Sequence, residues 1–123
     1  MPLKIEEHSN PTTLVLTGRL DTDTAPELDQ ALNRVLANTR TAARLVFDLS
    51  QLEYLSSAGI RCFVRARKAI EPTGGNVAIV NPQAPVRKVL DIVKAIPAGG
   101  IFESVEELDA YLDAIQRKVR AGE

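Results

Sequence analysis

The stretch RLVFDLSQLEYLSSAGIRCFVRARKAI, residues 44–70, decides the fold. Its first part, residues 45–49, opens with three apolar side chains in a row, which is typical of a strand covered on both faces. A short connection over residues 54–57 follows, and apolar side chains at helical spacing begin near Ala58. A buried strand that leads into an amphipathic helix predicts an α/β layer with a largely parallel sheet.

The segment before this stretch predicts two strands and a helix. Leu3 and Ile5 alternate with polar residues, residues 14–16 are apolar together, and Asn10 and Pro11 form a turn between them. Strands this close in sequence pair antiparallel. We expect Gly18 to end the second strand and a polar loop to follow. A helix is then expected over residues 25–37, because apolar residues recur there at helical spacing. They are Leu28, Ala31, Leu32, Val35 and Leu36.

The later segments continue the alternation of helices and strands. The central helix is expected to bury Ile60, Phe63, Val64 and Ile70. A strand over residues 77–80, a helix from Pro85, and a short strand at Ile101 and Phe102 come next. Ser104 lies three residues before Glu107, which is a capping-box pattern for a last helix. The expected fold is a single α/β domain over residues 1–119. Its mixed, mostly parallel sheet has four to five strands and about four helices, and residues 120–123 form a frayed tail.

Composition excludes several classes of function. The chain has 15 Lys and Arg against 16 Asp and Glu, with aromatics at 4% and no Trp, so neither a nucleic-acid surface nor a base-stacking platform is expected. One cysteine cannot form an internal disulfide. No secretory signal and no run of about 18 apolar residues is found, so we expect a cytoplasmic protein without membrane insertion.

Catalysis and metal binding have weak support. Ser57 follows a strand and precedes a helix, but a nucleophile elbow needs glycine two residues before it, and Leu55 stands there. The single histidine, His8, lies far away in sequence and has no cysteine or histidine cluster around it. Cys62 is expected to be a small buried apolar group. Gly74 and Gly75 precede a strand, so they form a turn and not a phosphate loop. We therefore expect no enzyme activity and no cofactor.

Two serines stand where the central strand gives way to the helix. The first amides of a helix have no internal partners and lie at the positive end of its dipole, so a capping oxygen or a phosphate is favoured there. Ser56 or Ser57 can be the N-cap, and phosphorylation of a capping serine would add about −1.5 to −2 charges that the helix end tolerates. These two uses are compatible.

Nearby carboxylates leave a similar choice open. Parallel strands end at one edge of a sheet, so Asp21 and Asp48 could lie beside the two serines. Alternatively, Asp21 or Asp23 caps the next helix and Asp48 anchors a turn.

These residues together resemble the STAS domain family, whose bacterial members include the anti-sigma factor antagonists. The resemblance covers nearly the whole chain, and it is most specific around Ser57 and Gly59. It is carried by three groups of residues: Gly18, Leu20, Asp21, Thr24, Ala25 and Pro26; Val46, Phe47, Asp48, Leu49 and Ser50; and Leu55, Ser56, Ser57, Ala58, Gly59 and Ile60.

The resemblance implies a partner-switching protein without catalysis of its own. In this family an anti-sigma factor that is also a serine kinase phosphorylates the antagonist, a serine phosphatase reverses this, and the unphosphorylated form binds the anti-sigma factor. The motif places the phosphoacceptor at Ser57, and the protein is expected to be a monomer or weak dimer. The implied partner-binding residues are Asp21, Thr24, Ser56, Ser57, Ala58, Gly59, Ile60 and Arg61.

Two departures from the family pattern keep an alternative open. Phosphorylated members often have an acidic residue before the acceptor and Ser or Thr after it, whereas Ser56 and Ala58 stand here. Ser56 is therefore a rival acceptor, and the alternative function is a STAS scaffold subunit of a transporter or signalling complex that binds without phosphorylation. The switch requires the Ser57 hydroxyl to face outward.

Overall fold

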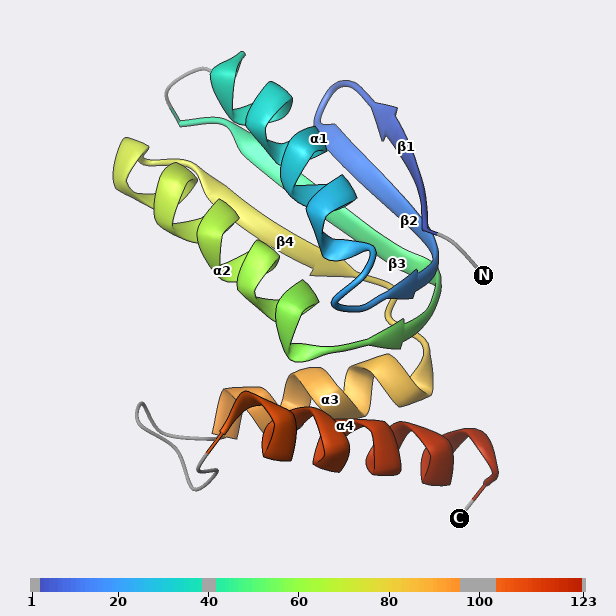
Figure 1. The fold of residues 1–123 in the computed structure, drawn as a ribbon. Helices are drawn as coiled ribbons and strands as arrows, with labels where there is room; N and C mark the ends of the chain where they lie inside the picture. The colour runs from blue at the N-terminus through green and yellow to red at the C-terminus, as the bar shows by residue number, and fades with distance from the viewer. Residues whose placement is uncertain (1–2, 39–41, 96–103, 123) are drawn as a thin grey trace.

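The computed structural model describes residues 3–38, 42–95 and 104–122, which form one mixed sheet with helices packed around it (Figure 1). The strands are β1 (Lys4–His8), β2 (Thr12–Leu20), β3 (Arg44–Leu55) and β4 (Asn76–Val80), in the spatial order β1-β2-β3-β4. β1 pairs antiparallel with β2, and the other neighbours are parallel. The predicted α/β class and the antiparallel N-terminal pair are confirmed.

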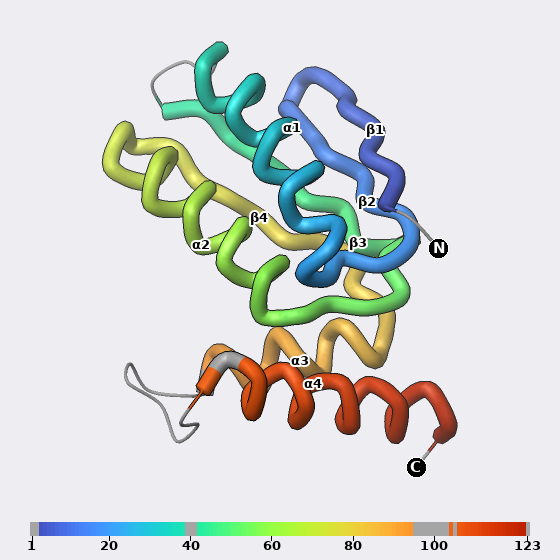
Figure 2. Tube along the Cα trace, in the orientation of Figure 1, coloured from blue at the N-terminus to red at the C-terminus, as the bar shows by residue number. Residues whose placement is uncertain are grey.

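Four helices are described, together with a short 3-10 turn at Glu71–Thr73. They are α1 (Ala25–Ala37), α2 (Ser57–Ile70), α3 (Ala84–Ala95) and α4 (Val105–Arg120). α1 and α2 lie side by side over one face of the sheet, and α3 and α4 lie together beside the start of α2 (Figure 1). The trace in Figure 2 shows the short path from β3 into α2 just above this second pair of helices.

The core lies between the sheet and the inner faces of the helices. The stripe predicted for α1 is buried at Leu28, Ala31, Leu32 and Val35. Phe47 of β3 meets Phe63 of α2 with ring centroids 4.7 Å apart. The prediction for α2 was wrong at Val64, whose exposed fraction is 43%, because this helix turns Cys62 and Ala66 toward the core instead.

β2 and β3 are longer than the sequence pattern predicts. Gly18 does not end β2: it lies inside the strand with φ of 103°, between two register shifts in the pairing with β3. Irregularities of this kind let a twisted pair continue, so β2 runs to Leu20 and β3 to Leu55. The expected loop before α2 is therefore reduced to Ser56.

β4 covers only the first part of β3. It pairs with residues 44–48, and within the described ranges no strand lies beyond it on that side. The predicted short strand at Ile101 and Phe102 falls outside the described residues. α4 begins as predicted, with the Ser104 hydroxyl accepting a hydrogen bond from the Glu107 N–H at 3.1 Å. In the part of the chain that is described, no helix has the length and apolar character needed to cross a bilayer.

Candidate functional site

The candidate site lies where β2 and β3 end next to each other. Leu20 pairs with Leu55, and the Ser56 N–H donates to the Leu20 carbonyl at 2.9 Å. Ser56 is extended, with φ −105° and ψ 175°, and α2 starts at the next residue. Asp21 follows Leu20 directly, so the structure brings Asp21 and the two serines together, whereas Asp48 lies back along β3 opposite Val80.

The two serine hydroxyls are buried. Ser56 is 3% exposed and Ser57 5% exposed. Neither Oγ reaches solvent or a hydrogen-bond partner among the described residues. Ser56 occupies the N-cap position, but its side chain makes no capping bond. The predicted N-cap position is confirmed at Ser56, but the expected capping hydrogen bond is not formed, and the Ser57 hydroxyl does not face outward as the switch requires.

A carboxylate from α4 caps α2 instead. Asp109 Oδ1 accepts a hydrogen bond from the Ser57 N–H at 2.9 Å. A negative charge at this end of a helix is favoured by the helix dipole and satisfies an amide that has no partner within the helix. Local sequence signals could not reveal this cap, because Asp109 lies 52 residues beyond Ser57.

The preceding backbone is also held by α4. Gln116 Oε1 accepts from the Leu55 N–H at 2.9 Å, and its Nε2 donates to the Leu55 carbonyl at 2.8 Å. Gln116 is fully buried, although polar side chains usually lie at the surface. This glutamine is a second residue that the sequence did not single out.

Asp21 and Thr24 organise the turn before α1. Asp21 Oδ1 accepts from the N–H groups of Asp23 and Thr24 at 3.0 and 3.1 Å. The Thr24 hydroxyl donates to the Arg19 carbonyl at 2.8 Å and accepts from the Asp21 N–H at 2.9 Å. The N-cap of α1 is Thr24 without a side-chain capping bond, so Asp21 holds the turn before the helix and does not cap it as the structural alternative expected. Its other oxygen, Oδ2, faces Arg19 Nε at 3.7 Å, and the side chain is partly exposed.

The remaining candidate residues form the first turn of α2. Ala58 and Gly59 are buried, Ile60 is half-buried and Arg61 is exposed. A groove of about 280 Å³ runs beside this turn between α1 and α2, and Ala58 and Arg61 line it. Pro26 and Asp29 of α1 form part of the opposite wall. The accessible part of the predicted partner surface therefore centres on this groove and Arg61.

Charged and aromatic groups surround the end of β3. The Arg19 guanidinium lies 3.9 Å from the centre of the Tyr54 ring, a distance typical of a cation–π contact. Burial raises the pKa of the Tyr54 hydroxyl, and the Asp113 carboxylate of α4 raises it further. Tyr54 is therefore neutral at physiological pH, and the two carboxylates that raise its pKa, Asp113 and Asp109, both come from α4.

Other candidate groups lie elsewhere. His8 is exposed on β1, with Nε2 3.6 Å from Glu6 Oε2. Cys62 is buried as predicted. Within the described ranges, no three His, Cys, Asp or Glu side chains gather as a metal site would require.

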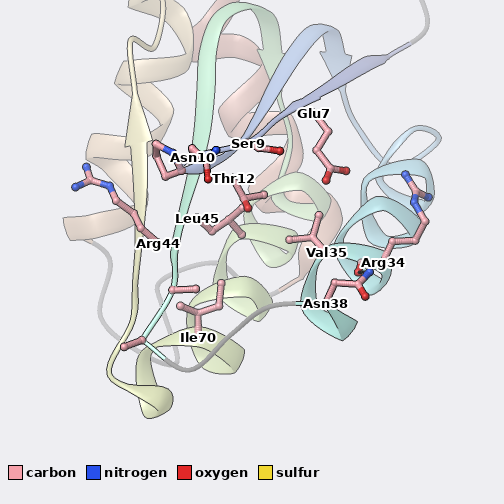
Figure 3. Close-up of a pocket in the computed structure, with 13 residues that line it drawn as sticks. Glu7, Ser9, Asn10, Thr12, Arg34, Val35, Asn38, Arg44, Leu45 and Ile70 are labelled. Carbon is pink, nitrogen blue, oxygen red and sulfur yellow. Dashed lines mark hydrogen bonds between the residues drawn. The ribbon is translucent and has the colours of Figure 1, made fainter.

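A larger cavity of about 680 Å³ lies at the other end of β3. Figure 3 shows it between Arg44 of β3 and Arg34 of α1, with Glu7 and Asn10 from the β1–β2 hairpin at the rim. Arg44 begins the strand whose last residue precedes the two serines, so this cavity is separate from the candidate site.

Similar solved structures share this fold. An anti-sigma factor antagonist from Mycobacterium paratuberculosis superposes with a TM-score of 0.62 at 24% identity, over 93% of this chain and 92% of the other. The anti-sigma factor antagonist SpoIIAA in its unphosphorylated form gives 0.55 at 18% identity, over 76% of this chain and 99% of that one.

Curated proteins and a family model agree with the fold. An anti-sigma F factor antagonist of Paenibacillus polymyxa is 24% identical over 119 residues, which are 94% of this chain and 92% of the relative. An anti-sigma-F factor antagonist of Mycobacterium tuberculosis is 33% identical over 66 residues, or 54% of this chain and 52% of the relative. These relatives are named for antagonism and not for catalysis, in agreement with the expectation of a non-enzymatic protein. The STAS domain model matches residues 2–108, and the chain therefore belongs to the STAS domain family.

Proposed function

We propose that this protein is an anti-sigma factor antagonist that binds an anti-sigma factor serine kinase and is released when Ser57 is phosphorylated. The observation that carries the proposal is the position of Ser57 as the first residue of α2, beside Asp21 at the paired ends of β2 and β3. The antagonist from Paenibacillus polymyxa, similar over 94% of this chain, supports the same class of partner.

The proposed partner surface is the set expected from the family motif, namely Asp21, Thr24, Ser56, Ser57, Ala58, Gly59, Ile60 and Arg61. Arg61 and Ile60 contribute its accessible part, because the other members of this turn are buried. We assign these roles to one domain of residues 1–119 that acts in the cytoplasm as a monomer or weak dimer, with a serine phosphatase restoring the binding form.

The chemistry would take place at Ser57 Oγ. In the transfer, the bond from Oγ to the γ-phosphorus of ATP forms as the bond to the bridging oxygen breaks. The hydroxyl proton passes to a base on the kinase, and ADP leaves. The phosphoserine would carry about −1.5 to −2 charges, and burying them against a partner without compensating cations is costly. A protein of the same fold, SpoIIAA, is known in a phosphorylated form.

One observation favours a second function, a STAS scaffold that binds its partner without covalent control. Both serine hydroxyls are buried in the described structure, so a kinase could not reach either one in this arrangement. Phosphorylation therefore separates the two candidate functions.

The test is intact-mass spectrometry after incubation with ATP and the kinase that co-purifies with the protein. We expect one phosphoryl group on the wild type and on Ser56→Ala, and none on Ser57→Ala. An undiminished gain in Ser57→Ala would remove the site assignment, and its loss in Ser56→Ala alone would move the site to Ser56. If none of the three proteins gains a phosphoryl group, the result supports the scaffold function instead.

A further inference from the structure

One face of α4 holds the end of β3 through polar contacts to its backbone. Gln116 satisfies both the N–H and the carbonyl of Leu55, as a residue of a paired strand would. One turn further along α4, Arg120 donates to the Glu53 carbonyl. This part of β3 lies beyond the residues that pair with β4, so α4 takes the place of a strand there.

The same face of α4 continues to the start of α2. Asp109 lies seven residues, or about two turns, before Gln116, and it caps the Ser57 amide. α4 therefore contacts the backbone of Ser57, and Ser57 Oγ is out of contact with solvent in this arrangement.

α4 meets its neighbours through both apolar and polar contacts. It lies beside α3 (Figure 1), and its Leu112 is fully buried in the same apolar cluster as Val86 and Val89 of α3. Toward β3 and α2 its hydrogen bonds come from Gln116, Arg120 and Asp109, and water can replace such bonds when the surfaces separate. Leu112 lies one turn before Gln116 on the same face, so opening the contact with β3 and α2 also exposes this leucine to water.

With α4 in place, two buried hydroxyl groups at the site lack hydrogen-bond partners among the described residues. Ser56 Oγ and Ser57 Oγ are buried without a hydrogen-bond partner among the described residues, and buried unsatisfied hydroxyls destabilise the state that contains them. When α4 lifts, water would satisfy both hydroxyls together with the Leu55 and Ser57 amides. This lowers the free energy needed to open the contact.

We propose that α4 is a reversible cover over Ser57, and that its lifting is the step that admits the kinase. The inference rests on the proposed function and specifies its regulation. A phosphoryl group on Ser57 Oγ would meet the carboxylate of Asp109 at the same helix end, so the two anions would compete for the Ser57 amide. The phosphorylated protein consequently keeps α4 lifted.

The first test measures access to position 57 without any kinase. In a Cys62→Ala background, Ser57→Cys introduces the only thiol of the chain. Its reaction with 5,5′-dithiobis(2-nitrobenzoic acid) reports how often α4 lifts. Adding Gln116→Ala removes both bonds to Leu55, and we expect the reaction rate to rise by about tenfold. Lys118→Ala, on the exposed side of α4, is the matched control and should leave the rate unchanged.

A second measurement uses the native serine. In Gln116→Ala, amide hydrogen exchange at Ser57 should accelerate together with exchange at Leu55, although the Ser57 N–H is bonded to Asp109 and Gln116 bonds to Leu55 and to the Leu112 carbonyl. If the substitution acts only locally, hydrogen exchange will accelerate at Leu55 alone, and this result would contradict the proposal that α4 covers Ser57. An unchanged thiol reaction in folded Gln116→Ala would overturn it as well. Ser56→Cys replaces Ser57→Cys in the thiol assay if the latter does not fold.

The kinase assay then separates the two proposals. If α4 gates the kinase, the initial rate of Ser57 phosphorylation should rise by about tenfold in Gln116→Ala and stay unchanged in Lys118→Ala. Equal phosphorylation rates in the wild type and Gln116→Ala would refute the gating while leaving the proposed function standing. If Ser57 is phosphorylated in no variant, the proposed function fails, and the thiol and exchange results alone decide whether α4 is a cover.

Discussion

Gly59 lets α2 lie against the ends of β2 and β3. A Cβ at this position would lie 2.5 Å from Leu20 Cγ and 2.7 Å from Leu55 Cδ1, and both leucines are fully buried. In an exposed helix, Gly→Ala gains about 1 kcal/mol, but overpacking a core costs about 1–3 kcal/mol. We expect Gly59→Ala to lower the free energy of unfolding by about 1–2 kcal/mol, as measured by urea denaturation.

The control for this prediction is Lys68→Ala, an exposed position on the same helix, which should change the free energy of unfolding by about 0.5 kcal/mol or less. A Gly59→Ala protein as stable as the wild type would mean that the two leucines can move apart. The close contact would then not be the reason for glycine in the family motif.

Cys62 makes the stability of the protein sensitive to alkaline pH. Burial, with the nearby Asp29 carboxylate, raises the pKa of its thiol from an ordinary value near 9 to about 12. Between these values the unfolded state has lost the thiol proton and the folded state keeps it, so this contribution to stability falls as the pH rises from about 9 to about 12. Below pH 9 it is constant.

Urea midpoints of the wild type and Cys62→Ala, compared between pH 8 and pH 11, test this dependence. The advantage of the wild type over the variant should shrink as the pH rises. The raised pKa of Tyr54 acts in the same direction in both proteins, so it cancels in the comparison. Parallel pH profiles for the two proteins would show that the thiol ionises equally in the folded and unfolded chains.

Among the helices and strands, the sequence predicted correctly those boundaries that local signals determine. α1 begins at Ala25 with Pro26 in its first turn, and α4 begins after Ser104, because these signals act within one turn of a helix. The ends of β2 and β3 were missed. Gly18 is a common strand breaker, yet here a bulge accommodates it, and pairing with a strand far away in sequence determines where β2 ends.

The candidate site could likewise be predicted only in part. The positions of Ser57 and Asp21 at neighbouring strand ends follow from strand order, which alternating helices and strands already indicate. The contacts with α4 could not be predicted, because Asp109 bonds to Ser57 from 52 residues away and Gln116 bonds to Leu55 from 61 residues away. A buried glutamine on a helix has no periodic signature, and its role becomes visible only when both of its hydrogen bonds to Leu55 are placed.

At the scale of the whole molecule, the two ends of the sheet differ in character. The cavity beside Arg34 and Arg44 lies at one end of β3 (Figure 3), and the closed junction of β3, α2 and α4 lies at the other. In the proposed switch, regulation at Ser57 would depend on whether α4 is in place, and the sheet with α1 and α2 would stay unchanged. Under this proposal, a single charge at Ser57 would alter docking without unfolding the domain.

The substitution Ser57→Asp tests this separation. Its carboxylate would lie beside Asp109, so α4 should lift while the sheet remains folded, and the new charge would be buried against the docked kinase without a partner. We expect the dissociation constant for the anti-sigma factor kinase, measured by calorimetry, to rise at least tenfold, or about 1.4 kcal/mol. Ser57→Asn, similar in size but uncharged, is the control and should bind more tightly than Ser57→Asp. If the two variants bind equally well, charge at Ser57 does not control docking, and the partner is held without a phosphorylation switch.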